Sequence, residues 1–137
     1  MPSQKLIATV TTSGAVASTN TAEVAIPRPS QAMILVCDLT AAGTDSIDTL
    51  DVKVQTNIGG LWVDVAYFTQ MLGNGGTKRF AAKLMSQTAF ALGDIAAALT
   101  AGNVRHLIGD GWRVNYVTVD ADADSSFTFS VYAVPLG

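Results

Sequence analysis

Alternation between apolar and polar residues is the dominant pattern along the chain. In residues 50–55 every second side chain is apolar, from Leu50 to Val54. A period of two places alternate side chains on opposite faces of a β-strand, so this segment predicts a strand with one buried face. Residues 61–69 repeat the pattern after Gly59 and Gly60, which accept positive φ easily. The two segments together predict a β-hairpin.

The same alternation predicts a second pair of strands, residues 112–119 and 127–134, connected by an acidic hairpin loop at 120–126. The apolar phase slips between Tyr116 and Val117, which predicts a β-bulge or a strand covered on both faces. Four further apolar segments remain. Residues 6–10 could pair at a sheet edge, and residues 24–26 predict a strand that stops at Pro27. Residues 33–39 predict a fully buried strand, whereas 78–84 is ambiguous between strand and helix.

Only one segment has a helical pattern. Asp94 is suited to cap the N-terminus of a helix over residues 95–101, and Gly102 is placed to end it. Ile95 and Leu99 are spaced four apart, as on one helix face. Two turns are marginal in water, so this helix near 94–101 is expected to lean on a sheet.

The number and length of these segments indicate the fold class. Seven or eight short strands with Gly and Asp turns and one short helix predict an all-β protein, a β-sandwich that is jelly-roll-like or related. A chain of 137 residues, 49% of them hydrophobic, is expected to fold as a single domain without disulfides or a structural metal. Residues 32–137 would form the sandwich body. Residues 1–31, rich in Ser, Thr and Ala, would form an N-terminal arm onto a neighbouring subunit or an edge strand.

Charged residues are scarce, and this changes the expected partners. They make up 14% of the chain, against about 25% in an average soluble domain. Eight Lys and Arg with a net charge of −3 cannot supply a basic face for a phosphate backbone, so nucleic acid is not an expected partner. Because interface cores are poor in charge, the composition favours a surface covered by partner subunits. A small neutral monomer is the alternative.

The sequence also bears on the compartment and on the single cysteine. Cys37 lies in the apolar run 33–37 and has no partner for an internal disulfide, so we expect an inert buried thiol. The N-terminus lacks the apolar core of a signal peptide, and no segment approaches the ~20 apolar residues that span a bilayer. Synthesis and folding in a cytosol, without a membrane partner, are therefore expected.

The residues do not support a catalytic or metal assignment. His106 is the only histidine, so a zinc site would have to be built almost wholly from carboxylates, which zinc seldom accepts. A Ser-His-Asp triad would need His106, for example with Asp110, but no G-x-S-x-G nucleophile elbow is present. We therefore expect an ordinary histidine at a strand end and predict no enzyme, no catalytic residue, no cofactor and no metal site.

The glycine-rich segment 73–78 superficially resembles a phosphate-binding loop. In a P-loop the position five after the first glycine is also glycine and the lysine follows it, whereas here Lys78 occupies that position. No helix is expected to follow. The segment is interpreted as a flexible hairpin turn.

The acidic segment 120–124 begins like a calcium loop, with Asp120, Asp122 and Asp124 at alternate positions. The rest of an EF-hand is missing, because the sixth position is Ser125 in place of glycine and the twelfth is Val131 in place of glutamate. A solvated acidic loop is the preferred interpretation, and weak calcium binding is left open.

Aromatic side chains on an open sandwich surface could stack on sugar rings. The candidates are Trp62, Tyr67, Trp112, Tyr116 and Tyr132. Trp112 shares its parity with apolar Val114, so at least one of the two indoles is expected to pack in the core. A carbohydrate-binding module is therefore an alternative rather than the leading interpretation.

Two parts of the chain resemble a known class of proteins. The matching segments are residues 50–55, 59–62 and 68–70 in the first part, and residues 101–110, 112–114 and 126–131 in the second. Together they look like the small β-rich decoration, or cement, proteins encoded among the head genes of tailed bacteriophages. The resemblance covers residues 50–134, although the acidic segment 120–124 departs from the Ser-Pro type of turn expected before Phe127.

The resemblance implies a virion structural protein on the outside of an icosahedral capsid, made in the host cytoplasm. Its expected partners are the major capsid protein and further copies of itself, most often as a trimer. It implies no catalytic or cofactor residues. The alternatives are a tail, neck or fibre component that recognises a host surface, and a carbohydrate-binding β-sandwich module.

Overall fold

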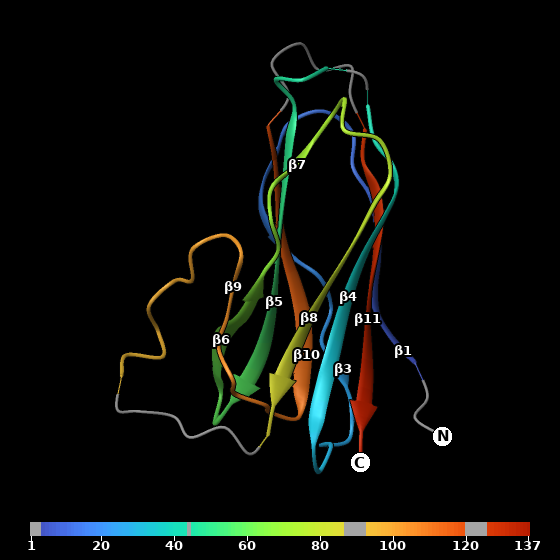
Figure 1. The fold of residues 1–137 in the computed structure, drawn as a ribbon. Helices are drawn as coiled ribbons and strands as arrows, with labels where there is room; N and C mark the ends of the chain where they lie inside the picture. The colour runs from blue at the N-terminus through green and yellow to red at the C-terminus, as the bar shows by residue number, and fades with distance from the viewer. Residues whose placement is uncertain (1–3, 44, 87–92, 120–125) are drawn as a thin grey trace.

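The protein is a β-sandwich of two antiparallel sheets (Figure 1). The computed structural model describes residues 4–43, 45–86, 93–119 and 126–137. The four-stranded sheet has the order β1 (Lys5–Thr11), β11 (Thr128–Leu136), β4 (Ala32–Ala41) and β8 (Lys78–Met85). The seven-stranded sheet has the order β2 (Val16–Asn20), β10 (Gly111–Val119), β5 (Thr49–Ile58), β6 (Leu61–Tyr67) and β9 (Asn103–Val104), with β3 (Val24–Ala25) beside β10 and β7 (Met71–Leu72) beside β5. The predicted all-β sandwich is confirmed.

The hairpin predicted from residues 50–69 is formed by β5 and β6. Its turn is Gly59 and Gly60, with φ of 61° and 92°, and Ile58 pairs with Leu61 across it. Positive φ at both central positions gives the turn that matches the twist of the strands, and glycine adopts it without strain. The Asn57 side-chain oxygen accepts a hydrogen bond from the Gly60 amide at 2.8 Å.

The core lies between the two sheets and is filled by every second side chain of the long strands. Tyr116 of β10 meets Phe129 of β11 edge to face, with ring centroids 5.7 Å apart. The largest fully buried side chains come from both sheets: Trp112, Phe127, Phe129, Met33, Leu35, Leu39, Leu50, Met71 and Leu84. The period of two therefore decides which side chains are buried.

The segment 94–101 is not a helix, contrary to the sequence prediction; it has a turn at residues 95–96, a bend at 97 and the start of another turn at 101. The Asp94 carboxylate does accept a hydrogen bond from the Ala96 amide at 3.0 Å. A helix would join the Leu99 amide to the Ile95 carbonyl. Instead, the Leu99 amide donates to Asp64 at 3.4 Å, and the Ile95 carbonyl accepts from Arg105 at 3.2 Å. Tertiary hydrogen bonds thus replace those of the helix.

The strands on either side of two predicted hairpin turns belong to different sheets. β10 pairs with β5 and β2, whereas β11 pairs with β4 and β1, so the predicted second strand pair does not form. In the same way β7 pairs with β5 and β8 with β4, so residues 73–77 pass from one sheet to the other. Alternation alone defines the strands but not their partners.

Other strand predictions are refined. Residues 78–84 are strand, and only one face of 33–39 is fully buried, because Ile34, Val36 and Asp38 point outward and remain half-buried. The register of β10 with β2 shifts between Tyr116 and Thr118, and β2 carries the extra residue there. The register of β10 with β5 is continuous.

The N-terminal segment contributes to both sheets. β1 is an outer strand of the four-stranded sheet, and β2 is an outer strand of the other. The Thr12 amide donates to the Phe127 carbonyl at 2.8 Å, which anchors the crossing between them. Among the described residues, no helix has the length and the apolar character that crossing a bilayer requires.

Replacing Phe129 tests the assignment of the core. Phe129→Ala is expected to lower the free energy of unfolding by about 3–5 kcal/mol, because it leaves a cavity between the sheets. Thr11→Ala, at an exposed position of the same sheet, should change it by no more than about 0.5 kcal/mol. Chemical denaturation measures both, and an equal effect of the two changes would contradict the assignment.

Candidate functional site

The histidine considered for catalysis has a structural contact. His106 lies in the chain segment that connects β9 to β10 and is half-buried. Its Nδ1 accepts a hydrogen bond from the Met85 amide at 3.0 Å. An accepting Nδ1 carries no proton in the neutral ring, so the proton is on Nε2. Asp110 instead pairs with Arg28, whose Nε lies 2.8 Å from the carboxylate. The structure therefore does not join His106 and Asp110 into a triad.

Two amides of the glycine-rich segment are already hydrogen-bonded within the chain. The Gly73 amide donates to the Asp48 carbonyl at 2.8 Å, and the Gly75 amide donates to the Leu72 carbonyl at 3.1 Å. A Cβ at Gly73 would clash with the Asp45 carbonyl oxygen, so close backbone packing requires glycine at this position. The segment is a tight crossing between the sheets.

The acidic segment 120–124 lies outside the described residues, so its proposed calcium binding stays a prediction. Among the residues that the structure does describe, no three His, Cys, Asp or Glu side chains are grouped to hold a metal ion.

Cys37 lies on the inner face of β4 and is fully buried. Burial, assisted by the charge of Asp38, raises the pKa of the Cys37 thiol to about 12. Only the thiolate reacts readily with electrophiles, so this cysteine is protected both by burial and by its protonation state.

Alkylation tests this protection. Native protein at pH 8 is expected to resist iodoacetamide, because the Cys37 thiol stays protonated and inaccessible. In denaturant the same thiol should be alkylated within the ordinary reaction time, as measured by mass spectrometry. Equally fast alkylation of the native protein would contradict the buried assignment.

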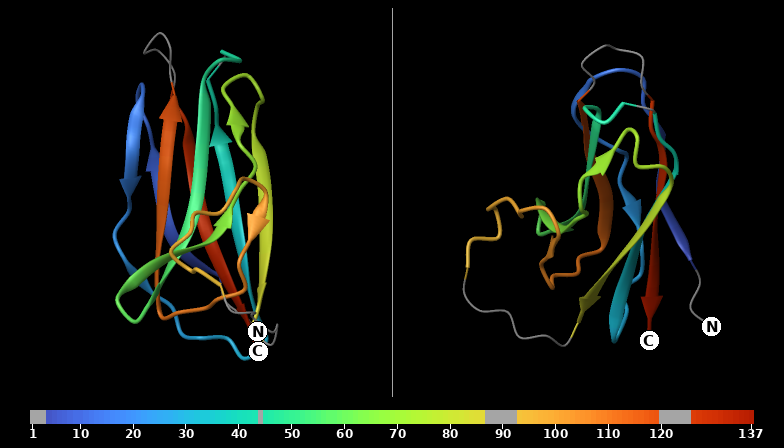
Figure 2. Two further views of the ribbon diagram at one scale, coloured as in Figure 1. Left: turned by 90° about the vertical axis from the view of Figure 1, so that its left-hand side faces the viewer. Right: turned by 45° about the horizontal axis from the view of Figure 1, so that its top comes forward.

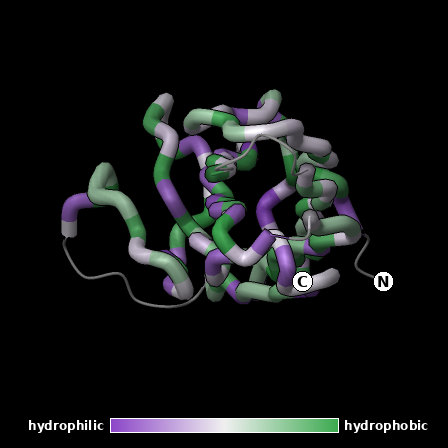
Figure 3. Tube along the Cα trace, turned by 90° about the horizontal axis from the view of Figure 1, so that it is seen from above, coloured by the Kyte–Doolittle hydropathy of each residue, from purple (hydrophilic) through white to green (hydrophobic). Residues whose placement is uncertain are grey.

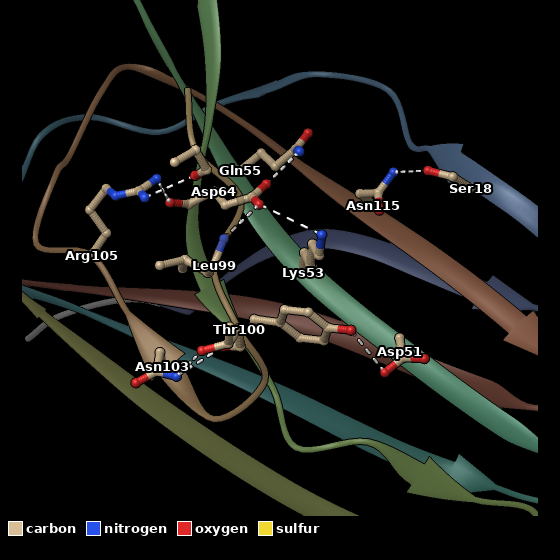
Figure 4. A network of polar contacts seen from close by, with 12 residues as sticks. Ser18, Asp51, Lys53, Gln55, Asp64, Leu99, Thr100, Asn103, Arg105 and Asn115 are labelled. Carbon is tan, nitrogen blue, oxygen red and sulfur yellow. Dashed lines mark hydrogen bonds and ion pairs between the residues drawn. The ribbon is translucent and has the colours of Figure 1, made fainter. Parts of the chain in front are cut away.

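A polar network lies on the outer face of the seven-stranded sheet and centres on Asp64 of β6 (Figure 4). This carboxylate is only 9% exposed. It accepts hydrogen bonds from the Gln55 side chain at 2.7 Å and the Leu99 amide at 3.4 Å, and Lys53 Nζ lies 3.7 Å away. A buried carboxylate is tolerated because each of these groups compensates for its lost hydration.

Arg105 completes the network from the chain segment that follows β9. Its guanidinium donates to the carbonyl oxygens of Asp64 at 3.0 Å, Ile95 at 3.2 Å and Ala97 at 2.9 Å. Figure 3 shows the segment it holds as a largely apolar loop at the side of the sandwich. The network therefore fixes the loop 93–105 against β6. Because its charged groups are occupied with one another, we assign it a structural role.

A second group of contacts extends the network along β5. The Tyr67 hydroxyl donates to Asp51 at 3.1 Å, and the Gln70 side chain donates to the same carboxylate at 3.1 Å. Lys53 Nζ lies 4.9 Å from the centre of the Tyr67 ring. Burial and then the Asp51 charge raise the pKa of Tyr67, so this hydroxyl stays protonated and donates at neutral pH.

Removing the central carboxylate tests its structural role. Asp64→Ala is expected to lower the free energy of unfolding by about 1–3 kcal/mol, because it leaves the Leu99 amide and Lys53 without their acceptor. Amide hydrogen exchange should accelerate in residues 95–105. Asp110→Ala, which breaks an exposed ion pair, should cost less than about 1 kcal/mol. Unchanged exchange in the loop of Asp64→Ala would show that another contact holds it.

The candidate aromatic residues are divided between the core and the two outer sheet faces, so they do not form one surface for stacking on a sugar. Trp112 is fully buried, and its Nε1 has no hydrogen-bond partner among the described residues. Tyr116 points into the core. Tyr67 and half-buried Trp62 lie on the outer face of the seven-stranded sheet, whereas Tyr132 lies on the outer face of the other sheet.

Trp62 has a specific neighbour on that outer face. The Arg113 guanidinium carbon lies 4.2 Å from the centre of the indole ring, and Arg113 Nε donates to the Gln55 side chain at 2.8 Å. Stacking of this kind is favourable because the ring face is electron-rich. One face of the indole is therefore occupied by a residue of the same chain.

The outer face of the four-stranded sheet is apolar over one half. Leu6, Tyr132, Val36 and Ala81 lie side by side across its four strands. The neighbouring row brings Val134 and Ile34 together, and Lys83 ends it. We call the side chains of Leu6, Ile34, Val36, Tyr132 and Val134 the apolar patch.

The rest of this outer face is polar. Thr9, Ser130, Asp38 and Arg79 form the next row, in which Arg79 lies 3.4 Å from Asp38. A shallow depression of about 310 Å³ joins the two halves along Val36, Asp38 and Tyr132. In Figure 1 no described segment covers this sheet from outside. The sequence pattern had assigned the whole of 33–39 to the interior, so the patch was not predicted.

Comparison with known proteins does not assign this chain to a family. A scan against protein-family models, a search of curated proteins and a search of solved structures found no match to this chain. The interpretation of the site therefore depends on its residues and geometry.

Proposed function

We propose that the protein is a non-enzymatic structural subunit that associates with copies of itself and coats the outer surface of a tailed-phage capsid. The observation that carries this proposal is the apolar patch on the four-stranded sheet. Contiguous apolar surface bordered by polar residues is typical of protein–protein contacts. Leu6, which lies within the patch, is 49% exposed.

The composition of the patch suits a protein partner. Its members are aliphatic apart from Tyr132, and the charged residues Asp38, Arg79 and Lys83 lie at its border. Interfaces commonly have an apolar centre and a polar rim. The low charge of the whole chain supports the same function, because a covered surface needs fewer charges for solubility.

The capsid is proposed from the resemblance of residues 50–134 to phage decoration proteins. In this proposal the subunits form a homo-oligomer, with a trimer favoured, and the major capsid protein is the second partner. A net charge of −3 suits a position on the capsid exterior, away from packaged nucleic acid.

A second candidate is a tail, neck or fibre component that recognises a host surface, including its carbohydrates. Half-buried Trp62 beside Arg113 favours this function, because an indole on an outer sheet face can stack against a sugar. The burial of Trp112 and the spread of the other aromatics disfavour it. Glycan binding lost in Trp62→Ala would support this candidate over the first.

Charge insertion in the patch tests the leading proposal. Leu6→Asp is expected to convert the oligomer into monomers, because it places a carboxylate in the proposed interface. Leu61→Asp is the matched control: Leu61 is 43% exposed and lies at the β5–β6 turn, away from the patch. Size-exclusion chromatography with light scattering measures the mass of each variant. Co-sedimentation with capsids measures the second interaction.

Two outcomes would contradict the proposal. One is a wild-type protein that stays monomeric at high concentration and does not co-sediment with capsids. The other is an equal loss of association in Leu6→Asp and Leu61→Asp, which would place the contact elsewhere.

A further inference from the structure

Four strands form the outer edges of the two sheets, and they differ in regularity. Outer strands expose backbone N–H and C=O groups that can pair with another chain. The register of β1 shifts between Leu6 and Ala8, the register of β2 shifts beside Thr118, and β9 has only two residues. In contrast, β8 pairs with β4 in continuous register over all eight residues, a length of roughly 26 Å.

A groove runs beside the free edge of β8. It has a volume of about 150 Å³ and lies between β8 of one sheet and β9 of the other. Its apolar lining includes Phe68, Phe80, Ala82 and Val104, and Val104 is 38% exposed. Figure 2 shows β8 and β9 on the same side of the sandwich. The Met85 amide at the end of this edge already donates to His106. Along the rest of β8, an extended chain would find both free backbone groups and apolar surface.

The charge of β8 restricts which chain can bind there. It carries Lys78, Arg79 and Lys83, three of the eight Lys and Arg of the protein. Arg79 approaches Asp38 at 3.4 Å, whereas Lys78 and Lys83 are exposed and form no ion pair with the described residues. Two copies of β8 side by side would bring like charges together, which disfavours self-pairing at this edge. An acidic chain would be attracted.

We infer that the free edge of β8 and the adjoining groove bind an extended acidic segment of a partner protein by β-strand addition. Backbone hydrogen bonds to β8 supply the pairing. Phe80 and Ala82 point toward the groove, while Lys83 points to the opposite face of the strand. The bound segment therefore alternates apolar residues, which enter the groove, with Asp or Glu, which approach Lys83. This contact uses Lys83 at the border of the apolar patch but none of the patch side chains, and it does not depend on the proposed capsid function.

The test uses two synthetic nine-residue peptides and the full-length protein. One peptide alternates Val and Thr with Glu, and the other has Lys in place of each Glu. Fluorescence anisotropy measures binding at low and high salt. The Glu peptide is expected to bind, and more weakly as salt rises, whereas the Lys peptide is expected not to bind. Amide hydrogen exchange should slow in β8 on binding, which is the signature of an added strand.

Variants on the two outer strands of one sheet locate the contact. Lys83→Glu is expected to weaken Glu-peptide binding about tenfold, while Lys5→Glu on β1 changes it less than about twofold. Arg79→Glu, on the same face of β8 as Lys83, provides a second test if the first variant is unstable. Equal binding of the two peptides, unchanged exchange in β8, or equal effects of Lys83→Glu and Lys5→Glu would overturn the inference.

Discussion

Burial of apolar side chains between the two sheets is the constraint on which the rest of the structure depends. The long strands bury every second side chain, and the fully buried residues Trp112, Phe129 and Leu35 come from three different strands. Since the inner faces supply the hydrophobic stabilisation, the two outer faces are free to differ. One carries the Asp64 network, and the other carries the apolar patch.

The sequence predicts those features of the fold that depend on the local alternation of apolar and polar residues. The sandwich class and the β5–β6 hairpin follow from alternation and from two adjacent glycines. The partners of β10 and β11, which are β5 and β4, could not be predicted in this way. Each strand presents a similar apolar face, and only the three-dimensional packing selects its neighbours. The segment 94–101 shows the same limit, since Arg105 and Asp64 take the hydrogen bonds that a helix would use.

The candidate sites were less predictable than the fold. Asp64 interrupts the run from Val63 to Ala66, and a lone carboxylate in an apolar run is the one signal of a buried polar network. Its partner Arg105 lies 41 residues away, so the contact leaves no local pattern. The apolar patch was missed because Ile34 and Val36 were expected to be buried with their neighbours. Their apolar character indicates burial, and in the proposed function another subunit supplies it.

The central claim is that the four-stranded sheet is covered in the assembled particle. Electron microscopy of the phage particle that the proposed function assigns to this protein tests the claim most directly, because it shows which face of each subunit makes contact. The account predicts density for the protein on the capsid exterior, with Leu6, Val36 and Tyr132 against a neighbouring subunit or the shell. Density in which this face is open to solvent, with every contact made through the seven-stranded sheet, would contradict it.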